Sequence, residues 1–293
     1  MRRALSLGIV LIAPLAVVAG VLATDRAFGA ARHDQDYVVR VTLPPAGGEI
    51  GLPKIEGPLD ASRPLVVIDA GHGGRDPGAG NGEIKEKALT LALAEALRDK
   101  LLAGGGVRVA LTRGNDRYLF LEERSGIARR LNADVFLSIH ADSAGNSEAR
   151  GGTVYTLSER GSSEEAERLA ASENRADAVN GVPLAKTSDS VSAILVDLAQ
   201  REAGENAAEL ASLILREGSG TLPFRERSRQ QAAFVVLKAP DVPSLLFEAG
   251  YISNPADADR LASPQGQASF ADATARALRV YFARRSRLAY GAG

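Results

Sequence analysis

The stretch Pro64–Asp69, PLVVID, most limits what this chain can fold into, because it is almost continuously apolar and ends at a glycine-rich turn. A run of this kind is typical of a strand that is buried on both faces. Comparable runs recur along the chain, and the segments between them carry apolar residues at helical spacing. The alternation predicts an α/β fold with a single, mostly parallel, twisted sheet and helices on both of its faces.

The expected elements follow from these runs. After the first strand we expect a helix with an apolar stripe from Leu89 to Leu101, which ends at Gly104–Gly106. Residues 63–285 are interpreted as one catalytic domain, with a helical insertion at about 160–230. Further strands are expected at 107–112, 133–139, 152–157, 234–238 and 243–248, and further helices at 121–131, 164–181, 190–203 and 267–284.

The first 31 residues have the pattern of an export signal. Two arginines precede an apolar run from Ala4 to Ala23, and small residues follow up to Ala31. An uncleaved anchor is the alternative, since about 20 apolar residues can just span a bilayer. Residues 32–62 are rich in proline and glycine and are interpreted as a connector. In both cases we expect the folded part to lie outside the cytoplasm.

The composition excludes several kinds of site. The 293 residues include no cysteine, which excludes disulfides, thiolate nucleophiles and thiolate metal ligands. The net charge of −1, without a basic stripe, gives no indication of nucleic-acid binding. A metal ion would therefore have to be held by histidines and carboxylates. Of the three histidines, His33 lies in the connector and belongs to no expected element.

The other two histidines and one glutamate lie at the ends of expected strands. His72 follows the first strand, His140 ends LSIH, and Glu248 ends PSLLFE. Ligands of open α/β sheets bind at the carboxyl ends of the strands, so these side chains should share one edge. A single histidine there is most often a hydrogen-bonded turn residue, but two favour a site, and a buried carboxylate needs a partner. Two histidines and a carboxylate are typical of catalytic Zn²⁺.

A further ligand is expected from the acidic stretch NGEIKEKALTLALA. Glu83 and Glu86 both precede the first helix, and Glu86 lies at its start, where the helix dipole favours a carboxylate. Ordinary helix-start chemistry would explain the same residue. The spacing alone does not decide between these interpretations.

Five ordered motifs resemble those of the zinc-dependent N-acetylmuramoyl-L-alanine amidases, the bacterial cell-wall hydrolases of the Amidase_3 type. The motifs are VVIDAGHGGRDPGA, EK before a helix, LTR with an aspartate three residues further on, SIHAD and FEAGYISN, and they cover about residues 64–285. The resemblance implies that His72, Glu86 and His140 bind one Zn²⁺ and that Glu248 is the catalytic carboxylate. One departure is Ala70, where the family usually has proline, and it changes no ligand.

The resemblance also selects Glu86 over Glu83, because the family's ligand directly precedes a lysine, as Glu86 precedes Lys87. It implies hydrolysis of the amide between N-acetylmuramic acid and L-alanine of peptidoglycan in the periplasm, with Glu248 taking the proton from water. Two alternatives stay open. One is a metallo-peptidase that cuts another murein bond, and the other is a non-catalytic cell-wall regulator, which would be expected to have lost a ligand or the acid–base glutamate.

The insertion resembles that of the cell-division amidases, in which a helix covers the active site until an activator with a LytM-type domain displaces it. The expected plug is the helix from about Glu164 to Asn180, and Glu173 in SENRAD is the candidate for an autoinhibitory zinc ligand. The alternatives are a plain structural insertion and a solvated acidic helix face.

Overall fold

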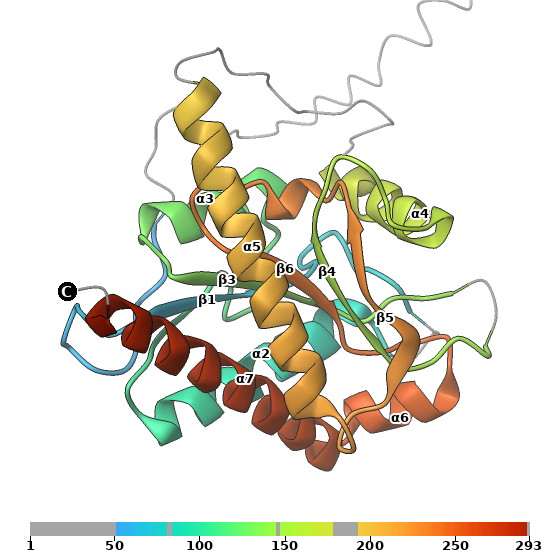
Figure 1. The fold of residues 1–293 in the computed structure, drawn as a ribbon. Coiled ribbons are helices and arrows are strands. Elements are labelled where there is room, and N and C mark those ends of the chain that lie inside the picture. Colours follow the sequence, from blue (N-terminus) through green and yellow to red (C-terminus); the bar gives the residue numbers. More distant parts are fainter. Residues whose placement is uncertain (1–50, 81–83, 145–146, 178–192, 292–293) are drawn as a thin grey trace, which may run out of the picture. The chain divides into compact units, whose positions relative to one another are not determined.

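The computed structural model describes residues 51–80, 84–144, 147–177 and 193–291, and the compact unit begins at Gly51. Its centre is a six-stranded sheet with helices on both sides (Figure 1). The expectations for the signal segment, His33, Glu83, and residues 178–192 of the insertion lie outside the described residues. Within the described part, no helix is both long and apolar enough to cross a membrane.

The sheet has the strand order β2-β1-β3-β6-β4-β5. Four of its pairings are parallel and one, between β4 and β6, is antiparallel, so the expectation of a mostly parallel sheet is confirmed. The strands are β1 (Leu65–Ala70), β2 (Arg108–Leu111), β3 (Val135–His140), β4 (Gly152–Leu157), β5 (Phe224–Ala232) and β6 (Ser244–Glu248).

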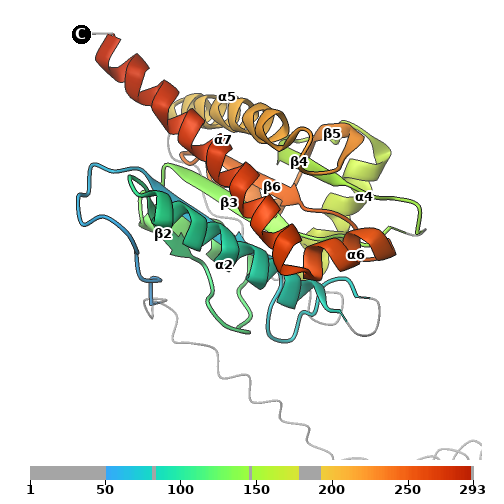
Figure 2. The ribbon, with the colours of Figure 1, turned by 90° about the horizontal axis from the view of Figure 1, so that it is seen from below.

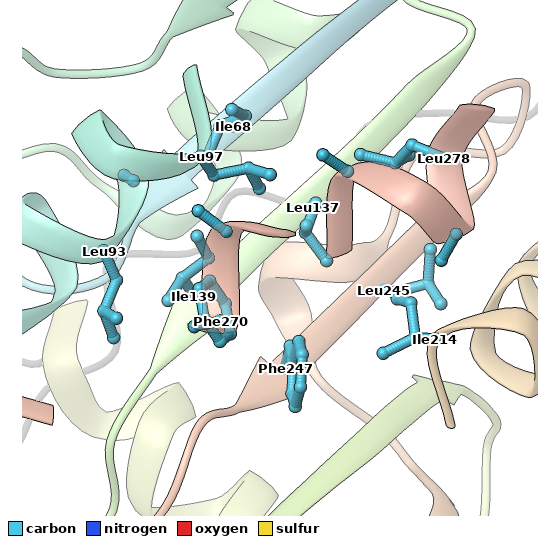
Figure 3. Packing of buried hydrophobic residues seen from close by; sticks show 14 of the residues in the cluster. Ile68, Leu93, Leu97, Leu137, Ile139, Ile214, Leu245, Phe247, Phe270 and Leu278 are labelled. Atoms are coloured by element: carbon cyan, nitrogen blue, oxygen red, sulfur yellow. The ribbon is translucent and has the colours of Figure 1, made fainter. Parts of the chain in front are cut away.

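Alternate residues of the strands bury into two separate cores. On one face, β1, β3 and β6 pack against α2 (Glu86–Gly104), α5 (Ala193–Gly218) and α7 (Pro264–Gly291), as Figures 2 and 3 show. On the other face, the odd-numbered residues of β1 pack with α3 (Leu121–Arg130), α4 (Glu164–Glu173) and the 3-10 helix η4 (Val235–Leu237). Burial on both faces explains why the central strands are continuously apolar.

The prediction of a strand at 234–238 was wrong. Val235–Leu237 form the 3-10 helix η4 instead, and Val236 and Leu237 point into the second core. The last-but-one strand is instead β5, FRERSRQQA, which was not expected because it lacks an apolar pattern. As one of the two edge strands of the sheet, β5 faces water over much of its length, and edge strands commonly carry charges.

The helices differ from expectation mainly at their ends. The plug helix α4 stops at Glu173 and continues as the 3-10 helix η3 (Asn174–Asp177). The second insertion helix runs on to Gly218, well beyond the expected end at 203. A short helix, α6 (Pro255–Ala262), was not expected, although Asn254 caps it and Pro255 starts it.

The end of the expected connector is part of the sheet. The backbone of Glu56 exchanges two hydrogen bonds with Val109 of β2, at 2.8 and 2.9 Å. Ile55 packs against the second core. The folded unit therefore begins several residues before the expected boundary at 63.

Candidate active site

The carboxyl ends of β1, β3 and β6 meet at one edge of the sheet. His140 lies directly opposite Glu248 in the register of β3 and β6, and His72 follows β1 by two residues. The rings of His72 and His140 meet edge to face, with centroids 4.9 Å apart. The structure therefore brings together the strand-end residues that the sequence placed at a common edge.

The side chain of His72 is held by its neighbour in the turn. Its Nδ1 lies 2.8 Å from Oδ2 of Asp76, and its backbone has a φ of 60°, which is uncommon outside glycine. The other ring nitrogen, Nε2, is buried and has no hydrogen-bond partner. The Asp76 contact leaves Nε2 as the free ligand atom, as in metal sites where a carboxylate orients the ring.

Two carboxylates reach the same pair of histidine nitrogens. The Oε2 and Oε1 atoms of Glu86 lie 3.0 Å from Nε2 of His72 and 3.2 Å from Nδ1 of His140. The Oε2 atom of Glu173 lies 3.5 and 3.4 Å from the same two nitrogens. All four side chains are largely buried, and none of them is more than 11% exposed.

These spacings fit a tetrahedral metal ion. With bonds of about 2.0–2.1 Å, tetrahedral nitrogen and oxygen ligands are separated by roughly 3.3 Å. The four measured distances bracket that value, and the ligand atoms of His72, His140 and Glu173 all lie within 4.8 Å of one another. The unpartnered Nε2 of His72 is a further sign, since a buried nitrogen otherwise pairs. The donor set therefore suits Zn²⁺.

Backbone contacts fix the position of Glu86. It begins α2, and its carboxylate accepts hydrogen bonds from the amides of Ala79 at 2.8 Å and Ala141 at 2.9 Å. Gly78 has a φ of 65°, and a Cβ there would lie only 2.6 Å from both Glu86 Oε2 and the His72 ring. Any larger residue at this position would push the two side chains apart.

Beneath these side chains lies a buried polar network that the sequence did not reveal. Arg124 donates to the carbonyls of Ala70 and His72 and forms an ion pair with Asp69 at 3.0 Å. Arg113 donates to the carbonyls of Ala70 and Gly71. The two arginines thus hold the carbonyls of the turn that carries His72.

Glu248 is completely buried and only half satisfied. Its Oε2 accepts a hydrogen bond from the Asp142 amide at 2.9 Å, whereas its Oε1 has no hydrogen-bond partner. Burial, and then the charges of Asp142 and Glu86, raise the pKa of Glu248 well above its ordinary value. Burial likewise raises the pKa of Asp142 to about 7. A carboxylate with a raised pKa and a free oxygen is suited to proton transfer.

The charges of the histidines and Glu86 change one another's pKa values in opposite directions. Burial would lower the pKa of His72, but the charge of Glu86 and the bond to Asp76 raise it well above 6.5. Burial would raise the pKa of Glu86, but His72 and His140 hold it far below its ordinary range. Burial raises the pKa of Glu173 despite both histidines. Among the described carboxylates here, Glu173 is therefore held less firmly as an anion than Glu86.

Comparison with known proteins assigns the chain. The family model for N-acetylmuramoyl-L-alanine amidases, Amidase_3, matches residues 66–280. The amidase AmiA of Escherichia coli (strain K12) is 40% identical over 220 residues, which cover 74% of this chain and 76% of that one. This chain belongs to the N-acetylmuramoyl-L-alanine amidase family. The resemblance read from the five motifs is thereby confirmed.

Solved structures of other amidases share the fold. AmiC2 of Nostoc punctiforme is 30% identical with a TM-score of 0.53, over 75% of this chain and 97% of that one. The catalytic domain of CwlV from Bacillus (Paenibacillus) polymyxa var. colistinus is 26% identical with a TM-score of 0.54, over 75% and 98% of the chains. This chain is therefore an enzyme of the N-acetylmuramoyl-L-alanine amidase class and not a purely regulatory cell-wall protein.

In this amidase, two residues that follow Glu173 hold the inserted segment over the site. The term "inserted segment" denotes α4 and η3, residues 164–177. The side chain of Asn174 bonds the Ala233 carbonyl and the Val235 amide, each at 2.8 Å. Asp177 accepts from the Tyr118 hydroxyl at 2.7 Å and from the Leu121 amide at 2.9 Å, so it caps the start of α3. The roles of Asn174 and Asp177 were not foreseen, although both lie in SENRAD.

Proposed function

We propose that this amidase is a zinc-dependent peptidoglycan hydrolase that cleaves the amide between N-acetylmuramic acid and L-alanine of the stem peptide. The observation that carries the proposal is the convergence of Glu86 and Glu173 on the same two histidine nitrogens, Nε2 of His72 and Nδ1 of His140. Family membership supports the substrate, and the apolar N-terminal run supports export to the periplasm.

We assign the metal to His72 Nε2, Glu86 and His140 Nδ1. When bound there, a zinc ion supplies Lewis acidity toward the amide carbonyl and toward water. Asp76 keeps Nε2 of His72 directed at this position, because it binds Nδ1. Arg113 and Arg124 hold the turn carbonyls, so that the ring does not have to be ordered when substrate binds.

Glu248 acts as the general base and then as the general acid. Its Oε2 is anchored by the Asp142 amide, which leaves Oε1 to take a proton from the attacking water. The same carboxyl then delivers this proton to the leaving nitrogen of L-alanine. A raised pKa makes that return step favourable, because a carboxyl that holds its proton too weakly would be a poor acid at neutral pH.

The resting enzyme is closed by the inserted segment. Glu173 occupies the open position next to the two histidines, where substrate and water must enter. Its release is a two-state change, and an activator with a LytM-type domain would shift it only by binding the open form more tightly. A partner of this kind is the simplest way to time the cleavage of the cell wall.

Digestion of purified murein tests the reaction. We expect fragment 51–293 with Glu173→Ala, which should open the site, to release stem peptides that begin with a free L-alanine amine when it is loaded with zinc. Metal analysis should give one zinc per chain. A different new amine terminus would indicate a metallo-peptidase instead. For export, residues 1–40 fused to a reporter that is active only outside the cytoplasm should give activity, whereas a cytoplasmic reporter signal would contradict the periplasmic location.

A further inference from the structure

A pocket of about 520 Å³ lies between α4 and the rest of the amidase. Two of its lining residues adjoin the active site, since Asp142 binds Glu248 through its amide and Ser172 precedes Glu173. Two others, Arg225 and Tyr251, come from β5 and from the turn after β6. The pocket therefore extends from the catalytic edge to a cation that none of the steps above uses.

Arg225 is held in one orientation. Its Nη1 donates to the Tyr251 hydroxyl at 2.6 Å, and its Cζ lies 5.2 Å from the centroid of the Tyr251 ring. Tyr251 is itself 1% exposed, and its amide bonds Asp257 at 3.0 Å, so the support is rigid. A guanidinium fixed in this way loses little freedom when it binds a carboxylate.

The anion that pairs with Arg225 comes from the inserted segment. Glu165 of α4 accepts a hydrogen bond from Nη1 of Arg225. The other cation of the pocket, Arg168, is also on α4, where its side chain is 77% exposed. When α4 leaves, Glu165 and Arg168 leave together. Arg225 then remains as the cation among the described lining residues, and it has lost the carboxylate that its Nη1 bonds in the closed form.

We propose that Arg225 and Tyr251 form a subsite for a carboxylate of the murein stem peptide, and that Glu165 occupies this subsite while the enzyme is closed. This inference rests on the proposed function. Glu165 and Glu173 would then act as two mimics of the substrate on one helix, the first in the carboxylate subsite and the second beside the histidines. The inserted segment blocks the enzyme by resembling what the enzyme cleaves.

The spacing of Glu165 and Glu173 along α4 indicates how far the recognised carboxylate lies from the scissile amide. Glu165 and Glu173 are eight residues apart within α4, which places their Cα atoms about 12 Å apart along the axis. An extended peptide covers about 3.3–3.6 Å per residue. The recognised carboxylate is therefore on the third or fourth residue from the scissile amide, and free acidic residues are expected there.

The test compares two probes in the Glu173→Ala background. One is a murein disaccharide peptide with free stem carboxylates, and the other is the same compound with those carboxylates amidated. Arg225→Gln should lower kcat/KM about ten- to hundredfold for the free acid, the range expected for hydrogen bonds between charged groups, and change the amidated probe less than twofold. Glu165→Gln should raise kcat/KM for the free acid, and Arg225→Lys should restore part of the loss.

The opposite signs separate a subsite from a structural ion pair. If the pair only fastens α4, Arg225→Gln and Glu165→Gln would both loosen it and raise cleavage of both probes alike, which would overturn the proposal. Arg229→Gln is the matched control, because Arg229 is an exposed arginine of the same strand that bonds Ser212. If the Glu173→Ala parent cleaves neither probe while it binds zinc, the proposed function fails and the subsite with it.

Discussion

The two walls of the active site are built differently. The fixed wall is formed by the ends of β1, β3 and β6, and α2 behind it buries five apolar side chains: Leu89, Leu93, Ala94, Leu97 and Leu101. The other wall is α4, which we propose to be movable, and it buries one leucine and two alanines, Leu169, Ala166 and Ala170. Burial of one leucine and two methyl groups contributes only about 3–5 kcal/mol. The groups that we propose as metal ligands are thus fixed by the core, whereas the proposed blocking group, Glu173, is on a helix with few buried apolar side chains.

The largest expected effect comes from breaking the fixed wall at its metal ligands. His72→Ala and His140→Ala should each abolish both zinc retention and murein cleavage, because either change leaves too few ligands. His33→Ala should change neither property. Metal analysis after gel filtration and release of dyed murein measure the two outcomes, and stoichiometric zinc in His72→Ala would remove that residue from the site.

Glu248→Gln should leave zinc and fold intact and lower the rate of cleavage about 10²- to 10⁴-fold, the usual contribution of general acid–base catalysis. The amide retains the hydrogen-bonding shape of Glu248 but does not accept a proton from water. A near wild-type rate, measured with zinc content and circular dichroism unchanged, would contradict the assignment.

Arg124→Met probes the foundation of the fixed wall. Burial would raise the pKa of Asp69, but Arg124, with Thr112 and Ser138, lowers it below its ordinary value. Without the Arg124 guanidinium, the buried carboxylate of Asp69 has no counter-charge. This should lower the free energy of unfolding by about 3–5 kcal/mol at pH 7.

The pH dependence of that loss checks its cause. Without Arg124, the pKa of Asp69 rises above its unfolded value, so the folded state binds the extra proton and the variant regains stability as the pH falls. Urea unfolding at pH 7 and pH 5 should therefore show a smaller deficit at pH 5. An equal deficit at both values would mean that packing, and not charge, is lost.

Glu173→Ala addresses the movable wall. Basal murein release, without any partner, should rise tenfold or more, equivalent to about 1.4 kcal/mol of lost closure energy. The point variant is preferable to removal of residues 164–180, because Asp177 caps α3 and its loss would disturb the fixed part. An unchanged basal rate in a variant that folds and binds zinc would refute autoinhibition by Glu173.

The smallest effect on murein release is expected from weakening the contact that Asp177 makes with the start of α3. Asp177→Asn removes the charge that caps α3, which should weaken closure by about 0.5–1 kcal/mol. Basal release should rise about two- to fivefold. Glu164→Gln is the control, since Glu164 is in the same inserted segment, is exposed, and makes only a long ion pair of 4.0 Å with Arg168. Equal rates for the two variants would show that Asp177 does not fasten the segment.

The sequence was sufficient for the fixed wall because its signals are local. Continuous apolar runs predicted the central strands, and their ends placed His72, His140 and Glu248 together. The motif match added Glu86. The edge strand β5 escaped prediction because exposed pairing requires no apolar period, and its residues read as a polar loop.

The side-chain contacts that support the site could not be predicted from the sequence, for another reason. Arg124 meets the carbonyl of His72 across 52 positions, and Asp177 meets the amide of Leu121 across 56. Side chain to backbone contacts of this kind leave no trace in spacing. An arginine or aspartate in a helical segment reads as an ordinary surface charge until the fold is known.

The edge strand β5 affects how readily copies of this protein associate with one another. A sheet that ends in an open strand offers unpaired backbone groups to any other strand, which is the usual starting point of fibrils. Here that margin exposes Arg227 and Arg229 beside Glu226, whereas Arg225 is paired with Glu165, so a neighbouring strand would have to approach two exposed arginines. The arginine-rich margin therefore protects a concentrated population of these molecules from polymerising edge to edge.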